Sequence, residues 1–142
     1  MVLLERPFVS VVLPHVRVTN TGSVRSAVTI QGYILDVRLT PASTEAVGAG
    51  ASPPQRELFD FDKVMLNPGE SAHVALKVPD AVLALGTAAG DLAVLAGEYD
   101  VAVGGLPLLE GAARITLKVR EGAAKVLFSL VELQERHEAS KN

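Results

Sequence analysis

Residues 58–78 read LFDFDKVMLNPGESAHVALKV, and this stretch decides the fold class. Polar and apolar residues alternate on both sides of Asn67-Pro68-Gly69-Glu70, as they do in strands that bury one face. Proline presets φ at the second position of a turn, and glycine accepts a positive φ at the third. The stretch therefore predicts two strands joined by a tight turn, that is, a β-hairpin.

The first of these strands carries two aromatic and two acidic side chains in alternation. Phe59 and Phe61 stand two apart, so we expect both rings on one face of the strand. Asp60 and Asp62 then share the opposite face, which we expect to be solvated. The strand would bury its aromatic face in a core.

Similar short segments lie on both sides of this stretch. Gly32 falls inside one of them and indicates a bulge or a close backbone approach. The other expected elements are alternating strands at residues 16–20, 28–37, 92–95, 99–103 and 115–119, a turn at residues 20–23 and a helical turn at residues 79–85. About seven short strands with regular turn signals predict an all-β, immunoglobulin-like antiparallel β-sandwich.

The chain is expected to hold one sandwich and a tail. Pro41, Gly48, Gly50, Pro53 and Pro54 indicate a long surface loop over residues 40–56, inserted within the domain. The sandwich is expected over residues 1–121. Residues 122–142 form a C-terminal extension that we expect to be partly disordered, since its end is polar.

Composition excludes several classes of protein. The 142 residues are 49% hydrophobic and only 4% aromatic, so the core must be aliphatic. The net charge is −3 and lysine and arginine do not cluster, which argues against binding to nucleic acid. Cysteine is absent, which removes disulfides, cysteine-based zinc sites and thiol chemistry. No stretch approaches the roughly 18 apolar residues of a membrane span, and the N-terminus does not read as a signal peptide.

Four segments in order resemble a known module. They are VRVTNTG at residues 16–22, ELFDFDKV at residues 57–64, LNPGES at residues 66–71 and GEYDVAVG at residues 97–104. Together they resemble the fibronectin type III-like domain at the C-terminus of family-three glycoside hydrolases, which are β-glucosidases and β-xylosidases. The resemblance covers roughly residues 10–120, and the Pro-Gly-Glu-Ser turn is its most specific part.

The resemblance implies a non-catalytic, accessory or structural role. In such hydrolases the catalytic carboxylates lie outside this module, so the resemblance implies no catalytic residue, no cofactor and no enzyme activity for this chain by itself. It implies the catalytic domains of a glycoside hydrolase as partners, in the same chain or in another. The compartment is unknown, and would be extracellular if the habit of the family holds. The structural motif residues are Asn20, Gly22, Phe59, Phe61, Pro68, Gly69, Gly97 and Tyr99.

Tyr99 has a physical role to play in such a sandwich. It starts a strand after a glycine turn, which is the setting of a tyrosine corner: the ring packs in the core and the hydroxyl bonds to nearby backbone.

The reactive side chains of the sequence form no catalytic or metal-binding motif. The carboxylates Glu57, Asp60, Asp62, Glu98 and Asp100 could form a hydrolytic pair, but the simpler interpretation is that they face solvent on alternating strands. A calcium site at Asp60 and Asp62 would need several more oxygen ligands. The histidines 15, 73 and 137 are scattered, and the serines 26, 71 and 129 lack a nucleophile motif, so neither a metal site nor a catalytic site is predicted.

One alternative function remains open. A free-standing immunoglobulin-like module could bind protein or carbohydrate through its loops. Carbohydrate modules stack sugars on exposed aromatic rings, and the chain has two tyrosines and no tryptophan.

Overall fold

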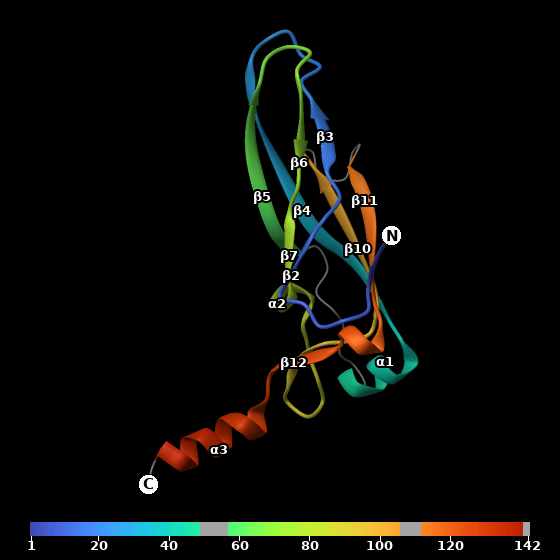
Figure 1. Ribbon diagram of the computed structural model, residues 1–142, viewed down its shortest axis with the longest axis vertical. Helices are drawn as coiled ribbons and strands as arrows, with labels where there is room; N and C mark the ends of the chain where they lie inside the picture. The colour runs from blue at the N-terminus through green and yellow to red at the C-terminus, as the bar shows by residue number, and fades with distance from the viewer. Residues whose placement is uncertain (49–56, 106–111, 141–142) are drawn as a thin grey trace.

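The computed structural model describes residues 1–48, 57–105 and 112–140, which form an elongated, strand-rich body (Figure 1). The fold is all-β, as the sequence predicts, but the described strands are shorter and more numerous than the expected seven or so. The strands are β1 (Val2–Leu4), β2 (Ser10–Val12), β3 (Val16–Thr19), β4 (Ser26–Leu39), β5 (Glu57–Leu66), β6 (Ser71–Val74), β7 (Lys77–Pro79), β8 (Leu85–Gly86), β9 (Leu92–Val94), β10 (Gly97–Gly104), β11 (Ala113–Val119) and β12 (Lys125–Phe128). The helices are α1 (Pro41–Val47), α2 (Asp80–Leu83), the 3₁₀-helix η1 (Glu121–Ala123) and α3 (Leu130–Ser140).

The main layer is a five-stranded sheet in the order β1-β11-β10-β4-β5. Its strands pair antiparallel, except that β1 runs parallel to β11, with Val2 opposite Leu117 and Leu4 opposite Val119. Sequence analysis does not predict β1 or β2, because three-residue strands carry too little periodicity to be recognised. The two edges of this sheet are β1 and β5.

The second layer is a ribbon of two short ladders, β2-β7 and β3-β6. The Leu13 N–H donates to the Leu76 carbonyl at 2.9 Å and so joins the two ladders. Pro14 follows directly and has no N–H to continue the pairing, which accounts for the interruption. The single strand predicted over residues 71–78 is therefore two strands.

The prediction of a hairpin around Pro68 is wrong, although the turn itself is present. Gly69 has φ +77°, and the Glu70 N–H donates to the Asn67 carbonyl at 3.0 Å. The strands on either side of this turn do not pair with each other, because β5 pairs with β4 and β6 pairs with β3. The turn thus carries the chain from the five-stranded sheet to the second layer, as sandwich topologies require.

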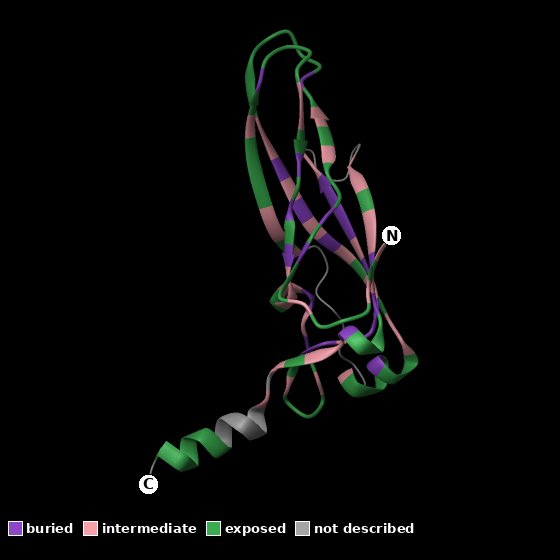
Figure 2. Cartoon of the chain, viewed as in Figure 1, coloured by how far each residue is buried: buried purple, intermediate pink, exposed green. Residues whose placement is uncertain are grey.

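The core between the layers is almost wholly aliphatic, as the composition predicts. Leu13, Leu76 and Val78 of the second layer belong to one buried cluster with Ile34 and Leu117 of the large sheet. Buried residues follow the inner faces of β4, β10 and β11 in Figure 2. The alternation along the sequence is the cause of this arrangement, because every second side chain of a strand points into the core.

The prediction of a loop over residues 40–56 is wrong in its first half. The helix α1 occupies Pro41–Val47, with Pro41 in its first turn and the Thr40 side chain accepting a hydrogen bond from the Ser43 N–H at 3.3 Å. Threonine at the N-cap followed by proline is a favoured helix start, which the loop-like composition concealed. Gly48 ends the helix with φ +90°. The remainder of the predicted loop, residues 49–56, lies outside the described residues.

Residues after Val119 add a second, smaller sheet. β12 pairs with β9, which pairs with β8, and Lys125 Nζ lies 2.6 Å from Asp80 Oδ2 of α2. The helix α3 then projects away from the sandwich in Figure 1, and residues 135–140 are exposed. In the part of the chain that the structure describes, every helix is too short or too polar to span a membrane.

Candidate functional site

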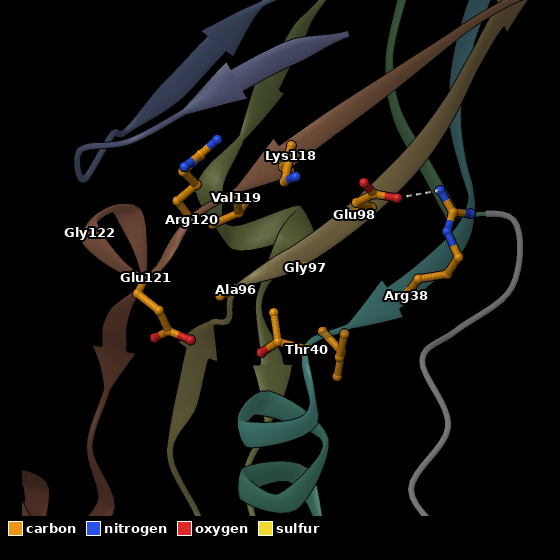
Figure 3. A pocket seen from close by; sticks show the side chains of 11 residues that line it. Arg38, Thr40, Ala96, Gly97, Glu98, Lys118, Val119, Arg120, Glu121 and Gly122 are labelled. Atoms are coloured by element: carbon orange, nitrogen blue, oxygen red, sulfur yellow. Dashed lines mark hydrogen bonds and ion pairs between the residues drawn. The ribbon is translucent and has the colours of Figure 1, made fainter.

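An open groove crosses one end of the five-stranded sheet (Figure 3). Its volume is about 680 Å³, and three strands and the turn after them line it. The lining residues are Arg38, Leu39 and Thr40 at the end of β4, Ala96, Gly97 and Glu98 at the start of β10, and Lys118, Val119, Arg120, Glu121 and Gly122 from β11 into η1. The groove thus has an apolar floor and a charged rim.

Two glycines that line the groove lie too close to neighbouring backbone to carry a side chain. Gly97 pairs with Leu39 on one side and Val119 on the other, and a Cβ there would lie 2.6 Å from the Arg38 carbonyl oxygen. A Cβ on Gly122 would lie 2.5 Å from the Glu5 carbonyl oxygen. Both positions therefore require glycine, because the atoms that a side chain would meet belong to backbone. The sequence of Ala96-Gly97-Glu98 predicts a turn, and this prediction is wrong because β10 already begins at Gly97.

A cluster of charges on the outer face of the sheet borders the groove. Arg38 Nη2 donates to Asp100 Oδ1 at 3.0 Å and to Glu98 Oε2 at 3.2 Å, and Arg38 Nη1 donates to Asp36 Oδ2 at 3.2 Å. The Thr116 hydroxyl donates to Asp100 Oδ1 at 2.8 Å. The hydrogen bond from Arg38 holds the pKa of the Asp100 carboxyl below its usual value, and the carboxylates raise the pKa of Arg38. Asp100 is therefore an anion at neutral pH.

The groove offers hydrogen-bonding and ionic groups but no activated nucleophile. The cations Arg38, Lys118 and Arg120 share its rim with the carboxylates Glu98 and Glu121. Arg38 is already paired, whereas Lys118 forms no ion pair with any residue in the described ranges. Sequence analysis missed this rim, because its members come from three strands; the one available signal was the alternation of charges along each strand.

Asn20 joins the turn at residues 20–23 to the turn at residues 67–70. Its side-chain amide donates to the carbonyls of Val24 and Leu66 at 2.9 Å each, and its Oδ1 accepts from the Gly22 N–H at 2.9 Å. Its backbone carbonyl accepts from the Gly69 N–H at 2.8 Å, and its N–H donates to the Glu70 carbonyl. Asn20 is 8% exposed, so its side chain is buried, and its bond to the Leu66 carbonyl is shielded from water. The turn with Gly22 and the turn with Pro68 and Gly69 thus form one corner.

Tyr99 forms the hydrogen bond of a tyrosine corner, as the sequence indicates. Its ring is 1% exposed, and its Oη donates to the Leu95 carbonyl at 2.7 Å. Burial raises the pKa of the Tyr99 hydroxyl to about 12, because the phenolate would lose its hydration. The hydroxyl is therefore neutral and remains a donor at ordinary pH.

The prediction that Phe59 and Phe61 share a face is wrong. The pairing of β4 and β5 shifts between Gly32 and Tyr33, so Phe59 occupies a bulge and packs against the core, while Phe61 is 65% exposed. A Cβ at Gly32 would overlap the Phe59 ring. The expected bulge at Gly32 is thus present, and it reverses the alternation that the sequence suggests.

Asp60 and Asp62 share one face of β5, as predicted, but only Asp62 is fully exposed there. Asp60 Oδ2 accepts a hydrogen bond from the Lys77 N–H at 3.0 Å and so links β5 to the second layer, whereas Asp62 is exposed. Asp62 lies opposite Ile30, whose side chain is in the core, so both aspartates are on the inner side of the strand. The alternation along β5 predicts solvent exposure for Asp60, but it carries no information about the second layer, which contacts this residue.

Most of the other candidate reactive residues, the carboxylates and histidines, lie far from one another. Of the five carboxylates, only Glu98 and Asp100 come together, and they do so around Arg38. The rings of His15 and His73 lie with centroids 6.2 Å apart, a proximity that the sequence does not show. Among residues 1–48, 57–105 and 112–140, no group of three histidines or carboxylates could hold a metal ion.

Comparison with known proteins identifies the module. Residues 42–106 match the model of the fibronectin type III-like domain. Over these residues the chain is similar to a fibronectin type III-like domain. The fold of the described residues agrees, since the tyrosine corner and the antiparallel layers are those of such a sandwich.

The relatives of this fibronectin type III-like chain are glycoside hydrolases. It is 33% identical over 89 residues to a putative β-xylosidase of Formosa agariphila, covering 63% of this chain and 10% of that protein. Its structure is similar to a β-glucosidase of Kluyveromyces marxianus, solved in complex with glucose, with TM-score 0.63, 26% identity and coverage of 85% of this chain and 13% of that one. A β-glucosidase of Listeria innocua in complex with gluconolactone is similar in fold, with TM-score 0.63, 21% identity and coverage of 86% and 15%.

These relatives confirm the resemblance that the sequence motifs indicate. The chain resembles the C-terminal, fibronectin type III-like module of such β-glucosidases and β-xylosidases. It spans only about a tenth to a seventh of the relatives' length, so the greater part of each hydrolase has no counterpart in these 142 residues.

Proposed function

We propose that this chain is a non-catalytic accessory module that stabilises the catalytic domains of a glycoside hydrolase, in the same polypeptide or as a separate partner. One observation carries the proposal: solved β-glucosidases about six times as long contain its fold over 85–86% of its residues. The domain is thus found as a small part of much larger enzymes.

The chemistry of the described residues supports this role. The carboxylates nearest Arg38 at the groove are paired with it, and Asp100 is held as an anion by this arginine. A glycosidase needs one carboxylic acid that stays protonated near neutral pH beside a second, ionised carboxylate. The lowered pKa of Asp100 is opposite to what the acid requires, so the Glu98–Asp100 pair is better suited to fixing Arg38 than to hydrolysis.

Two measurements test the proposal. The purified chain, incubated with aryl β-glucosides and aryl β-xylosides, is expected to release no aryl alcohol. In the second, the segment of the Kluyveromyces marxianus β-glucosidase that superposes on this chain is replaced by this chain. The chimera is expected to hydrolyse aryl glucosides and to melt at a higher temperature than the enzyme that lacks the segment.

The outcomes separate the possibilities. Turnover by the purified chain would contradict its non-catalytic role. A chimera that melts and acts like the shortened enzyme would contradict the stabilising role, because the chain would then contribute nothing to a hydrolase that contains its fold.

A further inference from the structure

Three large apolar side chains line the outer face of the edge strand β5. Leu58 is 46% exposed, Phe61 65% and Met65 53%. The register with β4 places them on one face, because Leu58 lies opposite Tyr33, Phe61 opposite Gln31 and Met65 opposite Ala27. We call Leu58, Phe61 and Met65 the β5 stripe.

Within residues 1–48, 57–105 and 112–140, the β5 stripe lies outside the hydrophobic core. The side chains by which β5 joins the core are Phe59 and Val64, which point to the other face. The strands that contact β5 are β4, its neighbour in the sheet, and β6 and β7, which belong to the second layer on the inner side. The second layer therefore leaves the outer face of β5 to water.

Exposing these three apolar side chains to water is unfavourable in free energy, and a partner surface that covers them would remove this penalty. Single exposed apolar residues are normal, but contiguous apolar patches on soluble domains mark interaction sites. Phenylalanine and methionine are also enriched in protein interfaces. Exposed side chains such as Val9, Val24 and Val126 lie on separate elements, whereas the β5 stripe gathers three on one strand.

We propose that the β5 stripe is the surface by which this module docks on the catalytic part of the hydrolase. This inference rests on the function proposed above. The occupant follows from length, because the relatives place about 85–90% of their residues outside the matched module, which leaves a large body available to cover this face.

The charge beside the β5 stripe defines the partner surface further. Lys63 is exposed on the same face, between Phe61 and Met65, and it forms no ion pair with a residue in the described part of the chain. The surface that covers the stripe is therefore apolar and presents a carboxylate to Lys63. Because a buried lysine without a partner would be costly, this carboxylate is required.

The chimera described above tests the inference. The stripe variant combines Leu58→Ser with Phe61→Ser, and the matched control is Val12→Ser, an equally exposed apolar residue on the opposite layer. With the unchanged chain, calorimetry is expected to show one joint transition above the melting temperature of the shortened enzyme. The stripe variant is expected to lose this joint transition and to melt in two steps, and the control is expected to keep it.

A second variant guards against a trivial loss of folding. Lys63→Glu retains the apolar side chains and is expected to lower the joint transition by opposing the carboxylate of the partner. In urea, the free chain is expected to unfold at the same midpoint with and without each substitution, because all four substituted positions are exposed.

The possible results are distinguishable. A joint transition that survives in both the stripe variant and Lys63→Glu would overturn the docking surface and leave the accessory function intact. A loss that also occurs with Val12→Ser would likewise overturn it. No joint transition with the unchanged chain would count against the accessory function itself.

Discussion

Replacing Tyr99 with phenylalanine removes one hydroxyl from the core and should measurably destabilise the domain. The Oη donates to the Leu95 carbonyl at 2.7 Å, and the ring is 1% exposed. A neutral hydrogen bond contributes about 1 kcal/mol net, and a carbonyl left without a partner raises the loss to about 1–3 kcal/mol. With an m-value of about 2 kcal/mol/M, the urea midpoint should fall by about 0.5–1.5 M.

The pH dependence gives the same substitution a second, independent readout. Burial raises the pKa of Tyr99 from 10.0 to about 12, so between these values the unfolded chain has released the proton and the folded one has not. The contribution of Tyr99 is therefore complete below pH 10 and is lost as the pH rises to 12, at about 1.4 kcal/mol per pH unit. The phenylalanine variant should lack this component of the alkaline loss.

Tyr33→Phe is the matched control. The Tyr33 hydroxyl donates to Gln31 Oε1 at 3.1 Å on the half-buried outer face, where water can replace it. Its midpoint should shift by less than about 0.3 M, since surface substitutions usually change stability by under about 0.5 kcal/mol. Equal shifts for the two variants, or an alkaline profile unchanged by Tyr99→Phe, would refute the tyrosine-corner argument.

Three further substitutions test other parts of the domain. Asn20→Ala removes three side-chain hydrogen bonds from the buried corner and should cost about 2–4 kcal/mol in urea unfolding; a cost under about 1 kcal/mol would contradict its bridging role. Gly97→Ala forces a Cβ against the Arg38 backbone and should cost about 1–3 kcal/mol, whereas Gly86→Ala, with no atom within 4 Å of the new Cβ, should change stability by under about 1 kcal/mol; similar values at both sites would refute the steric argument. Asp100→Asn should change the dependence of stability on acid pH, since the lowered pKa of Asp100 gives stability that is present above its usual pKa of 3.8 and is lost as the pH falls through the lowered value. The free energy of unfolding measured from pH 5 to pH 2 should therefore fall less steeply in the variant. Identical slopes would contradict the contribution of Arg38.

Local chemistry explains what the sequence could predict. Proline and glycine at positions 68 and 69 specify a turn by their own φ values, and the burial of Tyr99 follows from its place in an alternating strand. These features depend on neighbours in the chain, which a sequence displays. The aliphatic core follows from composition for the same reason.

Pairing between distant segments explains what the sequence could not predict. The turn at Pro68 looks the same whether the strands beside it pair with each other or with partners 23 to 58 residues away, as β5 and β6 do. The faces of Phe61 and Asp60 depend on a bulge whose partner is Gly32, in another strand. The rim of the groove has the same origin, because Arg38, Glu98 and Lys118 become neighbours only when three strands align.

The parallel pairing of β1 with β11 has a consequence for how the domain acquires its structure. Residues 2–4 find their partners at 117–119, and the Arg120 N–H then donates to the Leu4 carbonyl at 2.9 Å. During synthesis the first strand must wait until more than a hundred further residues have left the ribosome, and contacts so distant in sequence form slowly. Until β11 has been synthesised, β1 has no strand to pair with. The nascent chain then depends on other contacts to avoid pairing with neighbouring polypeptides.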